Sequence, residues 1–283
     1  VLQVADDESG LLKALGVGRG GRAVINRLVD APPSAKPRFE ARPLAPSVAD
    51  PRDDRAALLA DTELVVLIAE AQADPFAEVV ELAEAARVAG CCTLALIADA
   101  GVGPDVPVDL PERLHRLAAC SDALLFHPRR AGVELPDPDA TTAHEDFVRT
   151  ARRTLQAFAR LLYHPGVINA DCSELRAVLQ EGWAVLGAAE AVGPERVRKG
   201  VDAALASLGF QGIALAQATG LLVVVTVGFD VDPDDLEGTL ENLRGAASAP
   251  SQVAIGAPIE PEWSGRCEVV LLATGVDPRL ILS

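Results

Sequence analysis

The sequence predicts an α/β fold: a mainly parallel sheet in the first half, a long central helix, and a smaller second α/β unit. Short, uninterrupted apolar runs alternate with amphipathic helical segments, as expected for strands buried on both faces and joined by crossover helices. Hydrophobic residues make up 49% of the 283 residues, enough for a sizeable core. We therefore expect domains at 1–141 and 164–283, joined by a central helix at 142–163.

The strands predicted in the first half are the apolar runs 12–17, 64–69, 92–98 and 122–127. Each is short and continuous, which is typical of a strand covered by helices on both sides. Residues 75–89 predict a helix because Phe76 and Val79 recur on one face while glutamates occupy the other. The proline-rich stretches 31–51 and 103–111 are expected to be loops.

A longer helix is predicted over 142–163, where Phe147, Leu155 and Phe158 recur at helical spacing and Pro165 follows the last turn. Further helices are expected near 173–187, near 194–207 and from Pro233 onward. Asp232 is the expected N-cap of the helix that begins at Pro233. The strands expected in this half are 220–227, 252–257 and 267–273.

Charge and composition restrict the classes of partner. The formal net charge of −16 opposes binding to nucleic acid or to a bare anionic membrane, so any membrane role is expected to need a membrane-associated partner protein. No apolar stretch approaches the roughly 20 residues of a transmembrane helix, and we expect no signal peptide. The five cysteines lack metal-ligand spacing, so we expect reduced, mostly buried thiols, no metal site and a cytoplasmic location.

Three motifs occur in a fixed order along the chain. The first is GVGRGGRAVINRL at 16–28, and the second is HPGVINADCSELRAVL at 164–179. The third is GLLVVVTVGFDVDPDDLEGTLENLR at 220–244, followed by QVAIGAPIEP and VVLLATG. Together they resemble the FtsZ and tubulin superfamily over nearly the whole chain. The resemblance implies a Rossmann-like GTPase-type domain before the central helix and head-to-tail stacking of subunits.

The glycine-rich motif has two interpretations. By resemblance it is a phosphate loop, in which Gly18, Gly20 and Gly21 form the cradle at a helix N-terminus and Arg19 and Arg22 assist. In the structural interpretation, the glycines are simply what a tight turn from strand to helix requires. A glycine-rich loop alone does not decide between them.

The second motif matches the bacterial FtsZ pattern R-P-G-x-x-N-x-D-x-x-D-V, with His164 for Arg and Glu174 for the last Asp. The resemblance implies that Asn169, Asp171 and Glu174 reach the nucleotide site of the next subunit and act there as catalytic residues. A carboxylate in such a turn can orient an attacking water. The alternative is that Asn169 and Asp171 cap the helix that follows.

The expected nucleotide pocket departs from the family. Where members carry a glycine-rich G-G-G-T-G-T-G box, this chain has EAQADPFA at 70–77, which puts Glu70 and Asp74 beside the expected phosphates. The Asn-Thr-Asp element is replaced at 41–45, the P-N-D element reads Pro-Arg-Arg at 128–130, and Arg149 falls at or next to the guanine-binding Asp. A carboxylate accepts hydrogen bonds from the N–H groups of guanine, whereas an arginine side chain carries only donors and cannot replace it.

The arginines of the central helix, Arg149, Arg152, Arg153 and Arg160, also have two interpretations. The first is a solvated face paired with carboxylates. The second is a basic patch for an acidic partner or a different anionic ligand.

These features predict a pseudo-GTPase, an FtsZ-like assembly, cell-division or membrane-remodelling factor that contacts itself or another FtsZ-type subunit. No cofactor is expected, with GTP and Mg²⁺ as ligands only if the pocket is retained. Two alternatives remain: an active but divergent GTPase that forms its own filaments, and a nucleotide-independent structural dimer or polymer.

Overall fold

The computed structural model describes residues 12–29, 40–43, 55, 58–71, 76–99, 109–127, 143–180, 182–210, 214–246 and 252–282. They fall into two compact units. The first unit contains the described residues up to His127 together with Ala143–Ala159, and the second contains the described residues from Arg160 onward. The division lies in the last turn of the central helix, a few residues before the expected domain boundary at 164.

The first unit is built on a parallel sheet with strand order β2-β1-β3-β4-β5. Its strands are β1 (Leu12–Gly16), β2 (Glu40–Pro43), β3 (Leu64–Glu70), β4 (Cys92–Ala98) and β5 (Ala123–His127). Four of them confirm the predicted apolar runs to within a residue at each end. β2 lies in the stretch 31–51 that was expected to be a loop. It pairs with β1 at one end of the strand order, where Pro43 is tolerated.

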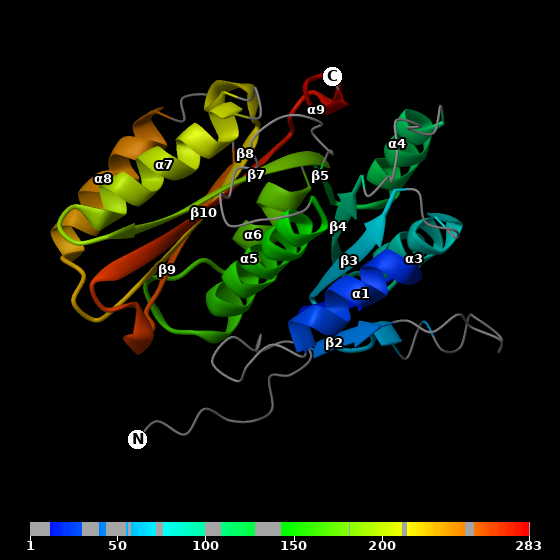
Figure 1. The fold of residues 1–283 in the computed structure, drawn as a ribbon, viewed down its shortest axis with the longest axis horizontal. Coiled ribbons are helices and arrows are strands. Elements are labelled where there is room, and N and C mark those ends of the chain that lie inside the picture. The colour runs from blue at the N-terminus through cyan, green and yellow to red at the C-terminus, as the bar shows by residue number, and fades with distance from the viewer. Residues whose placement is uncertain are drawn as a thin grey trace. The chain divides into compact units, whose positions relative to one another are not determined.

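Three helices described in the structure lie between these strands in the chain: α1 (Gly18–Val29), α3 (Phe76–Val88) and α4 (Leu110–Cys120); α5 (Ala143–Tyr163) follows β5 (Figure 1). The connection from β1 to β2 runs in the opposite direction from those that lead to β4 and β5. Right-handed crossovers therefore place α1 on one face of the sheet and α3 with α4 on the other. The helices predicted over 75–89 and 142–163 are confirmed as α3 and α5.

The second unit is a mixed sheet in the order β7-β10-β8-β9-β6. Its strands are β6 (Gly166–Ile168), β7 (Gly182–Val192), β8 (Gly220–Val227), β9 (Gln252–Pro258) and β10 (Arg266–Thr274). Only β8 and β9 pair in parallel. Its helices are α6 (Cys172–Leu179), α7 (Arg196–Phe210), α8 (Pro233–Ala246) and α9 (Pro278–Leu282). The side chain of Asp232 accepts a hydrogen bond from the Asp234 amide, as predicted for the N-cap of α8.

The helix expected over 173–187 was wrong in its second half. α6 ends at Leu179, and β7 begins at Gly182 with a φ of 90°. The segment is rich in glycine and alanine, but it pairs antiparallel with β10 along most of its length. A Cβ at Gly187 would overlap the carbonyl oxygen of Ala204 in α7, so the small residues permit close helix packing on the strand. Tertiary pairing has overridden local helix propensity.

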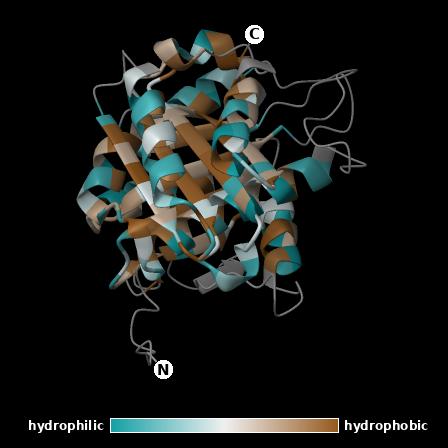
Figure 2. Cartoon of the chain, turned by 90° about the vertical axis from the view of Figure 1, so that its left-hand side faces the viewer, coloured by the Kyte–Doolittle hydropathy of each residue, from teal (hydrophilic) through white to brown (hydrophobic). Residues whose placement is uncertain are grey.

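Both units bury their strands beneath helices. β4 and β8 are buried along their whole length, and Figure 2 shows apolar strands beneath helices whose outer faces are polar. In the first unit Lys13 is buried in β1, where its Nζ donates to the carbonyl oxygens of Leu58 and Ala60, both at 3.0 Å. Among the described residues, no helix is long and apolar enough to cross a membrane.

Two glycines provide a matched test of this packing. A Cβ at Gly21 of α1 would overlap the carbonyl oxygen of Ile68, whereas one at Gly238 of α8 would meet nothing within 4 Å. We expect Gly21→Ala to destabilise the protein because the backbone of β3 must move. Gly238→Ala should instead stabilise it by about 0.5–1 kcal/mol through helix propensity. Chemical denaturation of both variants measures the difference, and a neutral Gly21→Ala would contradict the packing argument.

Candidate functional site

The glycine-rich motif forms the turn between β1 and α1. Gly18 begins the helix with a φ of 69°, a conformation that favours glycine. Gly16 and Gly21 lie so close that a Cβ on Gly16 would overlap the Gly21 carbonyl oxygen. The amide of Val17 also donates to the carbonyl oxygen of Ile68 at 2.9 Å. The structural interpretation thus accounts for the glycines, because a side chain at Gly16 or Gly21 would prevent the close approach of α1 to the strands.

Glu70, the last residue of β3, places its carboxylate against the first turn of α1. A Cβ on Gly20 would overlap that carboxylate. His144 lies near it, with 3.9 Å between its Nδ1 and Oε1 of Glu70. Burial raises the pKa of the Glu70 carboxyl, and the charges of His144 and Arg19 act in the opposite direction. The chain therefore sets a carboxylate of its own beside the glycines at which the motif predicted a phosphate.

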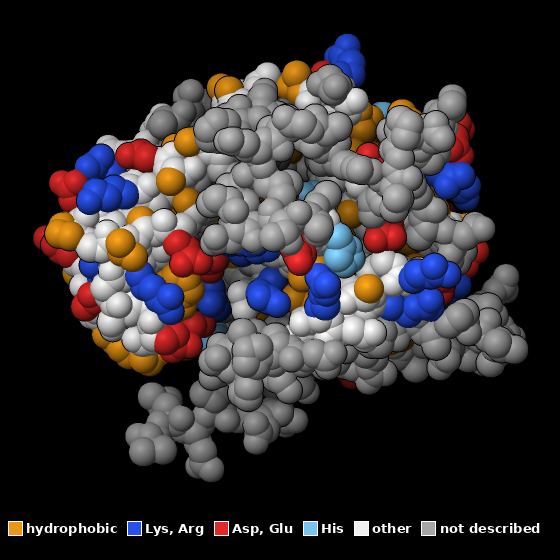
Figure 3. Space-filling view, viewed as in Figure 1, with side chains coloured by type: hydrophobic (Ala, Val, Ile, Leu, Met, Phe, Trp, Pro, Cys, Tyr) orange, Lys and Arg blue, Asp and Glu red, His pale blue; other side chains and the backbone are white. Residues whose placement is uncertain are grey.

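Only some of the other predicted pocket residues lie among the residues that the structure describes. Arg19 is exposed and Arg22 partly so on α1, and Arg149, Arg152 and Arg153 are partly exposed on α5. Figure 3 shows Lys and Arg side chains gathered over α1 and along α5. Asp74, residues 44–45 and residues 128–130 lie outside the described residues.

A histidine and an aspartate pair at the same edge of the first unit, and sequence reasoning missed them. His127 ends β5, and its Nε2 lies 3.0 Å from Oδ2 of Asp146 in the first turn of α5. The ring also contacts Phe147, with 5.8 Å between centroids. The carboxyl ends of β3 and β5 thus each carry a group that pairs with the start of α5. Among the described residues, no cluster of three or more potential ligands could hold a metal ion.

The turn between α5 and α6 is organised by a capping box. The side chain of Asp171 accepts from the Glu174 amide at 2.8 Å, and the Asp171 amide donates to the Glu174 carboxylate at 3.2 Å. Ser173 Oγ also donates to Asp171 at 2.6 Å. These bonds, first that of the Ser173 hydroxyl and then that of the Glu174 amide, hold the pKa of the Asp171 carboxyl below its ordinary value. The predicted capping role of Asp171 is therefore confirmed.

The predicted capping role of Asn169 is wrong. Its Oδ1 accepts from the Gly166 amide at 3.0 Å, so it closes the turn that precedes the helix. The reason is its position: the side chain is two residues before the N-cap and turns back toward β6. The turn presents Val167, which is 44% exposed, and Asp171, which is also exposed.

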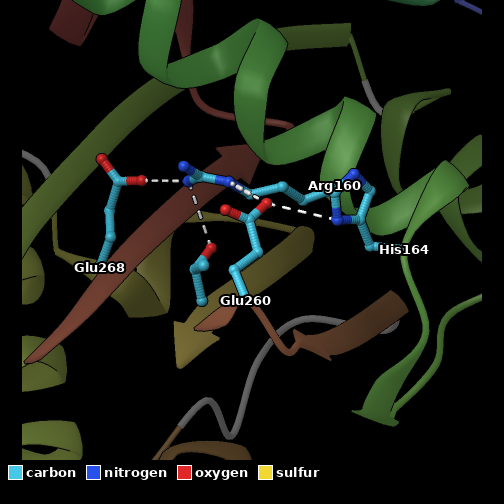
Figure 4. A network of polar contacts seen from close by, with 5 residues as sticks. Arg160, His164, Glu260 and Glu268 are labelled. Atoms are coloured by element: carbon cyan, nitrogen blue, oxygen red, sulfur yellow. Dashed lines mark hydrogen bonds and ion pairs between the residues drawn. The ribbon is translucent and has the colours of Figure 1, made fainter. Parts of the chain in front are cut away.

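Arg160 departs from the solvated face expected for the α5 arginines. It is 12% exposed and belongs to the second unit, where its Nε donates to Glu260 at 3.0 Å and its Nη1 to Glu268 at 2.6 Å (Figure 4). Its guanidinium carbon also lies 5.1 Å from the centre of the Trp263 ring. The expected pairing with carboxylates is present, but it is buried.

One end of the second sheet is apolar at its surface, which the sequence did not indicate. Ile259 bridges to Val227, and its amide donates to the carbonyl oxygen of Pro165 at 3.2 Å, so β8, β9 and the start of β6 meet there. Phe229 lies two residues beyond this row, whereas Val167 lies on the other side of the row because β6 runs antiparallel to β9. Phe229 is 73% exposed.

The end of β7 reaches the same edge. Val192 is opposite Arg266 at the beginning of β10, and the next residue of β10 is opposite Val227 of β8. Val192 is 70% exposed. We call Val192 and Phe229 the apolar end of the second unit. Large apolar side chains exposed together are typical of protein contact surfaces.

Comparison with known proteins agrees with this architecture. The model of the FtsZ family, C-terminal domain, matches residues 182–277. The cell division protein FtsZ of Wigglesworthia glossinidia brevipalpis is 32% identical over 139 residues, which are 49% of this chain and 35% of that protein. The chain thus spans well under two thirds of that relative.

Among solved structures, an empty FtsZ dimer from M. jannaschii superimposes with a TM-score of 0.74 at 18% identity, covering 95% of this chain and 89% of that one. CetZ2 from Haloferax volcanii, solved as a protofilament with bound GTPγS, gives 0.63 at 18% identity and covers 96% of both chains. The fold is therefore that of the FtsZ and tubulin class. Residues 182–277 are similar to the FtsZ C-terminal domain, and the described residues of the chain have the fold of FtsZ and CetZ2.

The capping box predicts a pH-dependent stability. Because the folded-state pKa of Asp171 is lowered, its contribution is present above the ordinary aspartate pKa and is lost as pH falls through the folded-state value. We expect Asp171→Ala to melt at lower temperature than the wild type at pH 7, with the difference shrinking toward pH 3. Asp171→Asn keeps an acceptor without the charge, so it should melt close to the wild type. Equal melting temperatures of Asp171→Ala and the wild type at pH 7 would contradict the capping role.

Proposed function

We propose that this chain is an FtsZ-type assembly factor with a closed nucleotide site, a pseudo-GTPase that acts in cell division or membrane remodelling through head-to-tail protein contacts. The observation that carries the proposal is the Glu70 carboxylate packed against Gly20. A glycine turn binds phosphate because backbone N–H groups at a helix N-terminus approach the anion closely. Here a side chain of the protein lies beside those groups.

Electrostatics add to the steric argument. Two unit charges of the same sign about 4 Å apart repel by about 4 kcal/mol at an effective dielectric constant of about 20. A phosphate placed against α1 would meet this repulsion from Glu70 unless the carboxyl were protonated or displaced. Arg19 and His144 offset part of the Glu70 charge, which leaves less positive charge for a nucleotide. The balance favours an unliganded turn.

The second unit supports the docking half of the proposal. The turn at 164–174 is held in shape by its own hydrogen bonds and exposes Val167, while Phe229 is exposed at the apolar end. A rigid turn that exposes Val167, in a unit that also exposes Phe229, suits contact with a folded partner better than contact with a small ligand. We propose that the partner is another FtsZ-type subunit. A second copy of this chain is the alternative, which the same exposed residues favour equally.

Nucleotide binding provides the first test. We expect no competable binding of a fluorescent GTP analogue with Mg²⁺ at high micromolar protein, because Glu70 fills the turn. Glu70→Ala should bind the analogue more tightly than the wild type, and Glu112→Ala, exposed on α4, serves as the control. Competable micromolar binding by the wild type would overturn the pseudo-GTPase proposal and favour an active GTPase.

The apolar end provides the second test. We expect Phe229→Ser to weaken co-sedimentation with an active FtsZ-type polymer and to reduce any effect on its GTP turnover. Val88→Ser is a matched control, since Val88 is 89% exposed but lies in the first unit. Pelleting of the chain alone, without nucleotide, would indicate self-association instead. If Phe229→Ser and Val88→Ser co-sediment equally well, the apolar end is not part of the interface.

A further inference from the structure

The exposed face of α1 is basic, although the chain as a whole carries a net charge of −16. The exposed and partly exposed residues of this helix recur at helical spacing, and those between them, at 20–21 and 24–25, are buried. Figure 3 shows Lys and Arg side chains gathered over α1. The outward residues include three arginines and no acid. We call them the basic stripe: Arg19, Arg22, Ala23, Asn26 and Arg27.

The exposed face of α8 carries the opposite charge. Leu236, Leu240 and Leu243 are buried on one side of this helix, and exposed residues recur at helical spacing on the other. The exposed set includes three carboxylates and no base, while Arg244 is exposed beside it. We call this set the acidic stripe: Asp234, Glu237, Gly238, Glu241, Asn242 and Gly245.

Several charges of the two stripes have no counterpart in their own subunit. Within the part of the chain that the structure describes, the side chain of Arg27 forms no ion pair, and neither do the carboxylates of Asp234, Glu237 and Glu241. Glu237 and Glu241 are also four residues apart, so like charges repel on neighbouring turns of α8. The acidic stripe is therefore unfavourable within the described subunit and suited to a cationic surface outside it.

The two stripes match in length and in shape. At about 1.5 Å per residue, 19–27 extends over about 12 Å and 234–241 over about 11 Å. A small residue lies in the middle of each, Ala23 in one and Gly238 in the other. Gly238 lowers helix stability, and a Cβ there would meet nothing within 4 Å, so packing inside the described subunit does not require a glycine. Small residues where two helices cross let the charged side chains on either side meet.

Net charge opposes the association of two copies, but mainly at long range. Each copy carries −16, so two copies repel one another as they approach. At about 0.15 M salt the Debye length is about 8 Å, so charges farther apart than this are largely screened. Opposite charges that face each other across a contact are screened less, and they fix its orientation and register. Physiological salt therefore favours a specific contact between complementary faces over general attraction.

We propose that the basic stripe of α1 docks against the acidic stripe of α8 in a second copy of this chain. Because the contact joins two different surfaces, it is heterologous, and each added copy leaves one stripe of each kind free. Copies then associate head to tail without a nucleotide. The contact uses neither a bound phosphate nor the turn at 164–174, so it is independent of the proposed function.

Charge reversal tests the contact. Sedimentation velocity of the full chain is measured at about 0.15 M salt, where the Debye length is about 8 Å, over a range of protein concentrations up to high micromolar. We expect the wild type to self-associate. Arg27→Glu and Glu241→Arg should each associate about fivefold to tenfold more weakly, because an ion pair is lost and a repulsion takes its place. Arg116→Glu and Glu112→Arg, exposed on α4, make the same changes in net charge and should behave like the wild type.

A mixture of the two variants identifies the surfaces. Arg27→Glu keeps an intact acidic stripe, and Glu241→Arg keeps an intact basic stripe. The mixture should therefore associate as tightly as the wild type but stop at two copies, because the remaining stripes are both altered. A mixture that associates as weakly as the separate variants would overturn the pairing of α1 with α8. If a reversal changes the circular dichroism spectrum, Arg27→Gln and Glu241→Gln replace it and should give smaller losses in the same direction.

The remaining outcomes separate this contact from other occupants. A wild type that stays monomeric at high micromolar concentration would overturn the inference, and if Arg27→Glu then lost co-sedimentation with an active FtsZ-type polymer, the basic stripe would serve that partner instead. Phe229→Ser should self-associate like the wild type. If Phe229→Ser abolished self-association while both reversals left it unchanged, the contact would lie at the apolar end and the stripes would be excluded.

Discussion

A carboxylate that leaves water must gain hydrogen bonds and opposite charge, because an isolated buried charge is too costly to keep. This constraint organises both units. In the first, Glu70 and Asp146 at the edge of the sheet pair with histidines. In the second, Glu260 and Glu268 require Arg160, and the end of α5 is fixed by that requirement. The glycine turn lies against Glu70, and the turn at 164–174 begins at His164 beside Glu260.

The same chemistry gives opposite results at the two places. Around Glu70 it places a carboxylate against Gly20, where a phosphate loop would need neutral backbone. Around Glu260 it stiffens the start of a turn whose tip stays exposed. Under the proposed function, the first carboxylate opposes an anionic ligand and the second steadies a turn that contacts a partner.

Much of the fold could be predicted because its signals are local. Buried parallel strands leave uninterrupted apolar runs, so β3, β4, β5 and β8 were visible in the sequence to within a residue. β7 was not, since its alanines favour a helix and only the pairing with β10 makes them a strand. The partners of β2, of His127 and of Arg160 are likewise distant in the chain, and no periodicity reveals them.

The candidate site shows the same limit. Sequence reasoning found Glu70, Asp171 and Glu174, because each belongs to a short motif with a resemblance or a capping pattern. It did not find Phe229 or Val192, whose exposure depends on where three strands end. It also treated His164 as a mere substitution in the turn. Its contact with Glu260 spans almost a hundred residues of sequence, which only the folded chain brings together.

The glycine turn and the turn at 164–174 differ in a way that bears on assembly. Head-to-tail stacking through a nucleotide needs a pocket on one face and a turn on the other, each intact. Here the turn keeps its shape through the capping box and the Asn169 hydrogen bond, while the glycine turn is occupied by Glu70. Under the proposed function, such a subunit would add to the exposed nucleotide of a neighbour but would offer none to the next subunit. We therefore expect it to terminate or modify a filament rather than to extend one by the same contact.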